Sequence, residues 1–155
     1  MKPEPRGFRY ALQPLRSKTD WDLQDLQQTL ADLHRKIDAS RQKVAECQGQ
    51  LSAASAELAQ QSAESQIMYA DRQNNAQNYI AQLSARLRTW RKELRELEKQ
   101  RDATVAELHR LQKFADGLDD NRDDDMKEYA KTLDKADIVE ADDAWLRGMK
   151  WRKPQ

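Results

Sequence analysis

The stretch LQDLQQTLADLHRKIDASRQKVAECQGQL, residues 23–51, decides the fold of this chain. Its apolar residues recur at alternating intervals of three and four, beginning at Leu23. This spacing is the heptad pattern, which places the apolar residues on one narrow face of an α-helix and is typical of coiled coils. The pattern continues without a slip to Met68. We therefore expect a first long helix that starts near Thr19 or Asp20, where a side chain can cap the helix.

A second heptad pattern runs over residues 76–118, but it does not share the frame of the first. Extending the first pattern puts a core position at Arg72, whereas the second pattern requires one at Gln73. Between the two patterns, residues 60–78 are rich in Asn and Gln, and Asn tolerates turn geometry. We interpret the frame change as the turn of a helical hairpin near residues 67–75. The alternative is a skip residue within one continuous helix.

An antiparallel hairpin pairs the two heptad patterns layer by layer. The favoured register sets Leu94 against Cys47 and leaves one polar layer, in which Arg101 faces Ser40. In a second register Leu108 faces Ser40, and more leucines lie opposite polar residues. Burial of each large apolar side chain is worth about 1.5–3 kcal/mol, so this second register is less stable. A parallel homodimer would stack Arg101 on its own copy, which is unfavourable in a core. We therefore expect a monomeric hairpin when the chain is free.

These patterns predict an all-α fold, a long antiparallel two-helix coiled-coil hairpin over residues 19–118. Residues 1–18 contain three prolines and mostly basic charged side chains, which predicts a flexible basic arm. Gly117 and a cluster of aspartates after it predict an acidic break in the second helix. Residues 119–155 are then expected to form a partly separate, amphipathic helical tail.

The overall composition limits the classes of partner. Basic and acidic residues number 27 each, so the whole chain has no net charge to draw it to nucleic acid or to an anionic membrane. No apolar run reaches the length of a signal peptide or of a membrane span, so we expect a cytoplasmic location without membrane insertion. The single cysteine, Cys47, excludes an intramolecular disulfide and suits a reducing compartment.

No motif for catalysis is present. The four glycines are far apart, so no glycine-rich phosphate loop exists, and the aspartate cluster lacks the glycine and closing glutamate of a calcium-binding loop. His34 and His109 fall on outward heptad positions. Cys47 falls on the apolar seam, where it acts as a small apolar residue. We therefore expect no enzyme, no cofactor and no metal site. Binding of nucleic acid by the arm, through Phe8 and Tyr10, is a weaker hypothesis.

The last residues include apolar side chains that have no layer in the hairpin. Trp145 and Trp151 lie among basic residues such as Arg152. Exposed Trp beside Arg is favoured at protein interfaces. We therefore expect both tryptophans to be exposed in the free chain and to contact a partner protein.

The opening segment FRYALQPL, residues 8–15, is followed at once by the long heptad helix. This arrangement resembles the start of the FliJ/YscO-type stalk proteins of bacterial type III export, flagellar and injectisome alike. MKEYA, residues 126–130, and WRKP, residues 151–154, are similar to the acidic-aromatic step and the basic tail near the C-terminus of that family. The resemblance covers the whole chain in outline. It implies a non-enzymatic central stalk, similar in shape to the γ subunit of rotary ATPases.

The resemblance also implies the partners of such a stalk. The end that carries both termini would bind a hexameric export ATPase through Phe8, Arg9, Tyr10, Leu12, Leu15, Trp145, Trp151 and Arg152. The tip of the hairpin would face an export gate protein or an export chaperone through Tyr69, Arg72, Asn74 and Asn75. The implied location is the cytoplasmic face of a membrane export complex. The competing hypothesis is a coiled-coil tether, scaffold or chaperone-like adaptor unrelated to export.

Overall fold

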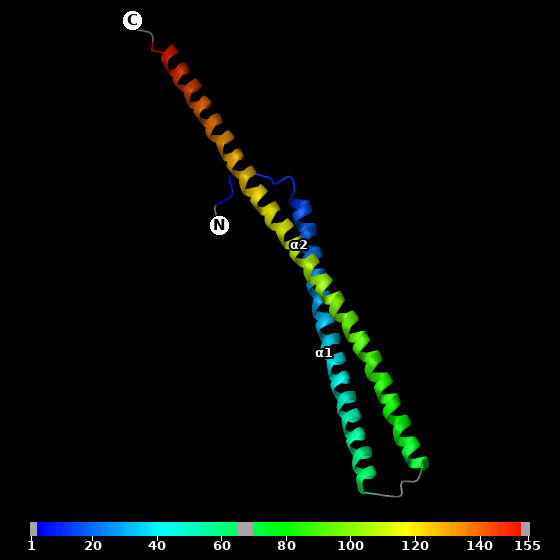
Figure 1. Ribbon diagram of the computed structural model, residues 1–155. Coiled ribbons are helices and arrows are strands. Elements are labelled where there is room, and N and C mark those ends of the chain that lie inside the picture. Colours follow the sequence, from blue (N-terminus) through cyan, green and yellow to red (C-terminus); the bar gives the residue numbers. More distant parts are fainter. Residues whose placement is uncertain (1–2, 65–69, 153–155) are drawn as a thin grey trace. The chain divides into compact units, whose positions relative to one another are not determined.

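The computed structural model describes residues 3–64 and 70–152. Two long helices hold 92% of these residues, α1 at Gln13–Glu64 and α2 at Ala70–Lys150 (Figure 1). The described residues contain no strand. The predicted all-α class is therefore confirmed, and the two long helices pack against each other.

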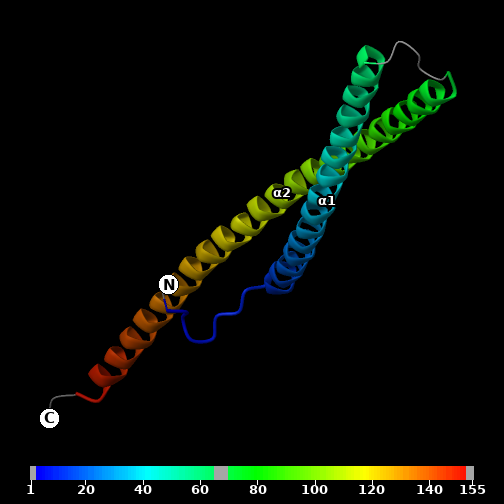
Figure 2. The same ribbon diagram turned by 90° about the horizontal axis from the view of Figure 1, so that it is seen from below.

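The chain divides into two compact units. Unit 1 contains Met1–Leu23 and Arg110–Gln155, and unit 2 contains Gln24–His109. The division differs from the predicted arm, hairpin and tail, because unit 1 combines the two ends of the chain. In unit 1 the segment before α1 lies against the second half of α2 (Figure 2).

The core of unit 2 is a narrow apolar seam between α1 and α2. Ile37, Cys47, Leu83 and Leu87 are each no more than 5% exposed. Every buried residue of unit 2 lies on one of the two predicted heptad patterns, which therefore identified the buried faces correctly. Half-buried side chains complete the cluster around Cys47: Val44, Leu51, Ala54 and Trp90.

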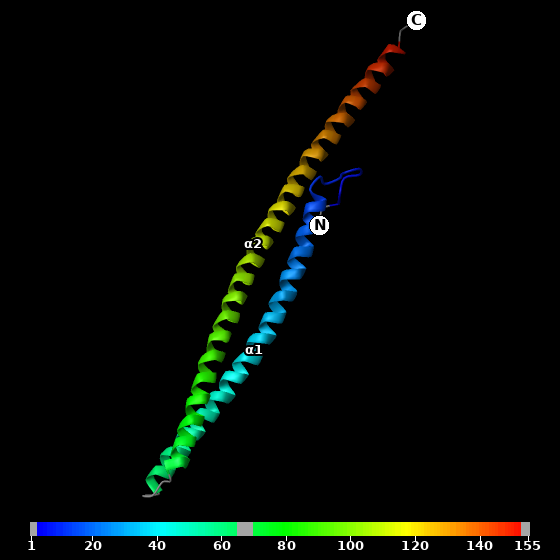
Figure 3. The same ribbon diagram turned by 90° about the vertical axis from the view of Figure 1, so that its right-hand side faces the viewer.

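Two polar contacts show the relative direction of the two helices in unit 2. Arg41 of α1 pairs with Glu98 of α2 at 3.0 Å, and Arg91 donates to Gln48 at 3.1 Å. The partner numbers fall on α2 as they rise on α1, so the helices are antiparallel, and Figure 3 shows the two stretches side by side. Both contacts join heptad positions that flank the seam.

The predicted register is wrong by one heptad. It sets Leu94 on Cys47, but the residues around Cys47 are Leu83 and Leu87, and the Cys47 thiol donates to the Leu83 carbonyl oxygen at 3.4 Å. A shift of one whole heptad keeps the two seams facing each other, so the heptad spacing alone does not distinguish the two registers. The contact between the Cys47 thiol and the Leu83 carbonyl oxygen distinguishes them.

Both predicted helix ends also need correction. α1 begins at Gln13, not at Thr19 or Asp20, because Pro14 suits the first turn of a helix and Thr19 donates its hydroxyl to the Leu15 carbonyl at 2.9 Å inside the helix. At the predicted turn, residues 70–75 are already helical. Gln73 is half-buried there, so the helix retains a packed face. The rest of that turn, residues 67–69, lies outside the described residues.

The predicted acidic break at Gly117 does not occur, because α2 is continuous from Ala70 to Lys150. Ala115 and Leu118, on either side of the glycine, are 3% and 6% exposed. One glycine inside a helix costs only about 1 kcal/mol relative to alanine, and burial of the two neighbours offsets that cost. The aspartates that follow are exposed, so water solvates their charges.

We predict that the register can be read with a second cysteine. In Leu87→Cys the new thiol joins the buried cluster of Cys47, so mild oxidation should close a bond within one chain and give a compact monomer on a non-reducing gel. Leu94→Cys is the matched control, since it lies on the same seam one heptad away. Faster closure in Leu94→Cys than in Leu87→Cys would show that the register described here is wrong.

We predict that Gly117→Ala stabilises the protein. A methyl group added at Gly117 meets no atom within 4 Å, and the substitution removes backbone freedom from the unfolded chain. The free energy of unfolding should rise by about 0.5–1 kcal/mol in urea denaturation followed by circular dichroism. A fall in stability would mean that the helix is distorted at this glycine.

Candidate partner-binding surfaces

The segment before α1 is anchored to α2 through the buried side chain of Tyr10, which is 8% exposed. The hydroxyl oxygen lies 2.9 Å from the Leu118 carbonyl oxygen and 2.9 Å from Oδ1 of Asn121, and its one proton serves one acceptor at a time. Desolvation by burial, followed by the charges of Asp125 and Asp119, raises the pKa of Tyr10. The neutral phenol is therefore the form that the docked segment favours.

A second anchor lies further along α2 at Tyr129. Its ring packs at a tilt against Phe8, with the ring centres 5.6 Å apart, and its hydroxyl donates to the Arg6 carbonyl at 3.2 Å. Gly7, between these two residues, has a φ of +84°, and a Cβ there would lie 3.0 Å from the Tyr129 hydroxyl. Both the backbone conformation and the space therefore require glycine.

Ion pairs add to these two anchors. Arg16 holds Asp119 with two nitrogen atoms, at 2.8 and 3.2 Å, and also pairs with Asp20. These bonds, first of all the one to Asp119, raise the pKa of Arg16. Glu4 pairs with Arg122, whose Nε is buried without a hydrogen-bond partner in the described part of the chain.

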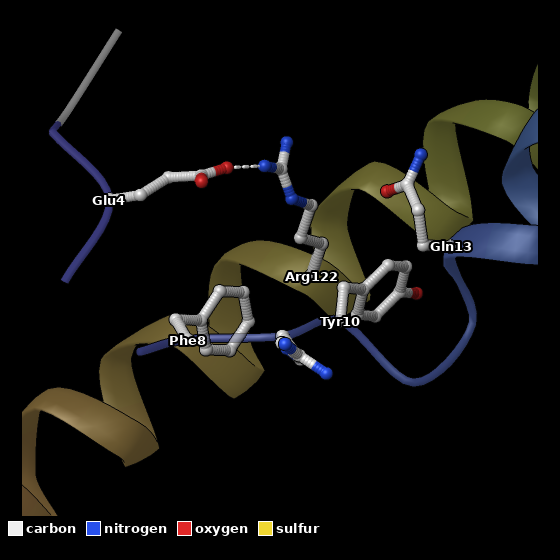
Figure 4. Close-up of a pocket in the computed structure, with 6 residues that line it drawn as sticks. Glu4, Phe8, Tyr10, Gln13 and Arg122 are labelled. Atoms are coloured by element: carbon white, nitrogen blue, oxygen red, sulfur yellow. Dashed lines mark ion pairs between the residues drawn. The ribbon is translucent and has the colours of Figure 1, made fainter. Parts of the chain in front are cut away.

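A shallow hollow of about 530 Å³ lies beside these anchors and is lined by Glu4, Phe8, Arg9, Tyr10, Gln13 and Arg122. Figure 4 shows the carboxylate of Glu4 and the guanidinium of Arg122 directed at one another across it.

The predicted ATPase-end residues of the arm are thus not equally accessible. Tyr10 is buried against α2 and Phe8 is half-buried, whereas Arg9 is exposed and Leu12 and Leu15 are 40% and 39% exposed. These fixed contacts differ from the predicted flexible arm. Its partner on α2 is more than a hundred residues away in the chain, and no local sequence signal indicated it.

The C-terminal end of α2, beyond the contacts of the arm, is exposed to solvent. Residues 131–152 are all exposed, including Trp145 at 64% and Trp151 at 90%, which confirms the predicted exposure of both tryptophans in the free chain. Arg152 is exposed just beyond the end of the helix. We define the tail face as the apolar residues that share one side of this helix: Ile138, Val139, Trp145, Leu146 and Met149.

The tail face is about 120° wide at 100° per residue, a width typical of an amphipathic helix that buries one side against a partner. Its members are between 51% and 64% exposed. Leu133 projects from the opposite side of the same helix and is 37% exposed. Asp142 interrupts the tail face near its middle. The described residues place no other segment on this face.

The predicted tip residues are only partly described. Arg72, Asn74 and Asn75 are exposed on the first turns of α2 and belong to a helix, not to a loop. Tyr69 lies outside the described residues. The first turn also carries Asp71, whose negative charge suits the N-terminus of a helix.

Sequence reasoning missed a basic stripe in unit 2. Arg88, Arg91 and Arg95 line a hollow of about 380 Å³ together with Leu51, Ser84 and Leu87. The signal was present in the sequence, because intervals of three and four place all three arginines on one side of a helix.

The described residues contain no group of side chains suited to hold a metal ion. His34 and His109 are both exposed, and Cys47 is buried in the seam. Within residues 3–64 and 70–152, neither helix holds an apolar stretch long enough to cross a bilayer. Comparisons of the chain with protein-family models, curated proteins and solved structures found no match.

We predict that the docked arm depends on the Tyr10 hydroxyl. Tyr10→Phe removes a hydrogen bond worth about 1 kcal/mol, so trypsin should cleave at Arg6 and Arg9 about fivefold faster at neutral pH. Because the pKa of Tyr10 is raised, docking is fully stabilised below about pH 10, the pKa of free tyrosine, and weakens as the pH rises further. Ultraviolet titration of tyrosinate, compared with Tyr10→Phe, measures that step.

Tyr79→Phe is the matched control, since Tyr79 is 50% exposed and should alter neither cleavage nor titration of the arm. Gly7→Ala should speed cleavage in the same way as Tyr10→Phe, because the added methyl group meets the Tyr129 hydroxyl. Wild-type cleavage rates in both Tyr10→Phe and Gly7→Ala would contradict the docked arm.

Proposed function

We propose that this chain is a non-enzymatic coiled-coil hairpin that binds other proteins, and that it acts as a FliJ/YscO-type central stalk in a bacterial type III export apparatus. The observation that carries the proposal is the tail face, whose five apolar side chains are each more than half exposed. An exposed apolar surface of this kind is a feature of protein-interaction sites. Its location beyond the reach of α1 and the arm supports a partner from outside the chain.

The hairpin part of the proposal draws support from unit 2. The antiparallel contacts and the burial of heptad positions are the features of a two-stranded coiled coil within one chain. Such a hairpin leaves the start of α2 at its tip, where Arg72, Asn74 and Asn75 are exposed. Under the proposal these residues meet the export gate or an export chaperone.

The ATPase end of the proposed stalk is unit 1, which contains both ends of the chain. Three exposed residues of the arm region belong to it: Arg9, Leu12 and Leu15. Two basic residues lie near the C-terminal edge of the tail face: Lys150 and Arg152. Basic residues at the edge of an apolar surface favour a partner with acidic residues beside an apolar groove. Tyr10 does not belong to this surface, because α2 buries it.

The proposed role requires no chemistry from the chain itself. A stalk changes the conformational equilibrium of its ATPase by binding one conformation of the ring more tightly than another. Hydrolysis of ATP then belongs to the partner, and the chain contributes only contacts that differ between the two states. The proposed location is the cytoplasmic face of the export complex.

The test uses the full-length chain and the partner captured with it from the host's own cells. One variant combines three substitutions that remove large side chains from the tail face: Trp145→Ser, Leu146→Ser and Met149→Ser. Burial of each is worth about 1.5–3 kcal/mol, so binding should weaken at least about tenfold. The stimulation of ATP turnover by the captured ATPase should be lost, while helicity by circular dichroism should be unchanged.

Leu133→Ser is the control, since it changes an apolar side chain on the opposite side of the same helix. Wild-type binding by the triple variant would show that the tail face is not the docking surface. Capture of a partner that hydrolyses no ATP, with binding still dependent on the tail face, would favour the tether or adaptor over the stalk.

A further inference from the structure

Two stripes of opposite charge lie on α2, one in each unit. The arginine stripe of unit 2 consists of Arg88, Arg91 and Arg95, all exposed. Arg91 donates to the neutral side chain of Gln48 at 3.1 Å. None of the three arginines forms an ion pair with a carboxylate in the described part of the chain. Their positive charges therefore remain available to a binding partner.

The aspartate stripe of unit 1 consists of Asp116, Asp120 and Asp123, which are also exposed. Neighbouring aspartates have partners: Asp119 pairs with Arg16, and Asp124 with Lys127. The three members of the stripe, in contrast, form no ion pair with any of the described residues. The same helix thus carries three unpaired carboxylates in one unit and three unpaired guanidinium groups in the other.

The two stripes match in spacing when they are read in opposite directions. From Asp116 onward the intervals are four and then three, and from Arg95 backward they are also four and then three. On α-helices these intervals keep each set on one side, with the same axial separations. Antiparallel helices therefore bring every arginine level with one aspartate.

We infer that a second copy of this chain docks antiparallel along α2, with the arginine stripe of one copy on the aspartate stripe of the other. Each contact joins unit 2 of one copy to unit 1 of another copy. Guanidinium and carboxylate groups suit this docking, since they form two parallel hydrogen bonds per pair.

A second copy fits better than an unrelated acidic partner, because this chain itself supplies the complementary stripe at the matching intervals. The 27 basic and 27 acidic residues cancel, so two copies meet without net repulsion. Exposed ion pairs are individually weak and are screened by salt, so the association is reversible and is strongest at low ionic strength. It does not depend on the partner proposed above for the tail face.

The experiment measures the mass of the full-length chain by sedimentation equilibrium at two ionic strengths. At about 0.01 M, where charges act over about 30 Å, the average mass should rise with concentration above the 18.1 kDa of one chain. At about 1 M, where the range falls to about 3 Å, it should return to one chain. A mass of one chain at both ionic strengths would overturn the inference.

Charge-reversed variants test the residues. One variant reverses the arginine stripe: Arg88→Glu, Arg91→Glu and Arg95→Glu. The other reverses the aspartate stripe: Asp116→Arg, Asp120→Arg and Asp123→Arg. Each variant alone should remain a single chain at low salt. An equimolar mixture of the two should associate, because every reversed stripe then faces a stripe of opposite sign. No association in the mixture, with both variants helical by circular dichroism, would contradict the pairing.

A control variant reverses three exposed basic residues outside the stripe: Lys36→Glu, Lys43→Glu and Arg86→Glu. It has the same change in net charge as the arginine-reversed variant and should associate like the wild type. Polyglutamate serves as the probe for a foreign acidic partner. A wild-type chain that binds polyglutamate through the arginine stripe but never self-associates would assign the stripe to such a partner and overturn the inference.

Discussion

The burial of a narrow apolar seam between α1 and α2 is the constraint on which the rest of the structure depends. Ile37, Cys47, Leu83 and Leu87 supply its buried centre in unit 2, and each of the three aliphatic side chains contributes about 1.5–3 kcal/mol by leaving water. A seam this narrow leaves most of each helix surface exposed. α1 has 52 residues and α2 has 81, so α1 is too short to cover every seam position of α2. The uncovered length of α2 includes the tail face and the part of the helix that the arm contacts.

The sequence predicted which faces are buried but not how they align. Heptad spacing identifies the apolar face of each helix, and the buried residues of unit 2 all lie on those faces. Two registers one heptad apart, however, both keep apolar residues in contact. The choice between Leu87 and Leu94 opposite Cys47 is visible only in the packing around Cys47, whose thiol meets the Leu83 carbonyl oxygen. A comparison of seam residues alone does not include this backbone contact.

The exposure of a candidate surface could be predicted where its side chains have no partner within the chain. It could not be predicted where a partner distant in sequence covers the side chain. Trp145 and Trp151 have no layer in the hairpin, so their exposure followed from the heptad pattern. Tyr10 belongs to the predicted flexible arm, but its hydroxyl contacts the Leu118 carbonyl oxygen on α2, which is distant in sequence. The break expected at Gly117 failed for a related reason: a local cost of about 1 kcal/mol is outweighed when the neighbouring side chains are buried.

The exposed end of α2 differs in sequence from the part of the seam that packs against α1. Beyond Leu118 the seam positions become polar, with Arg122 and Asp125, and an ordinary apolar helix would gain little by packing there. The non-helical arm covers this part instead, through hydrogen bonds and an ion pair. Beyond Tyr129 the apolar residues return. Val139 and Leu146 continue the heptad spacing of the seam, whereas Ile138, Trp145 and Met149 lie about a quarter turn around the helix from it. Because these three residues have a different direction from the seam, they suit a separate partner and not a longer pairing of α1 with α2.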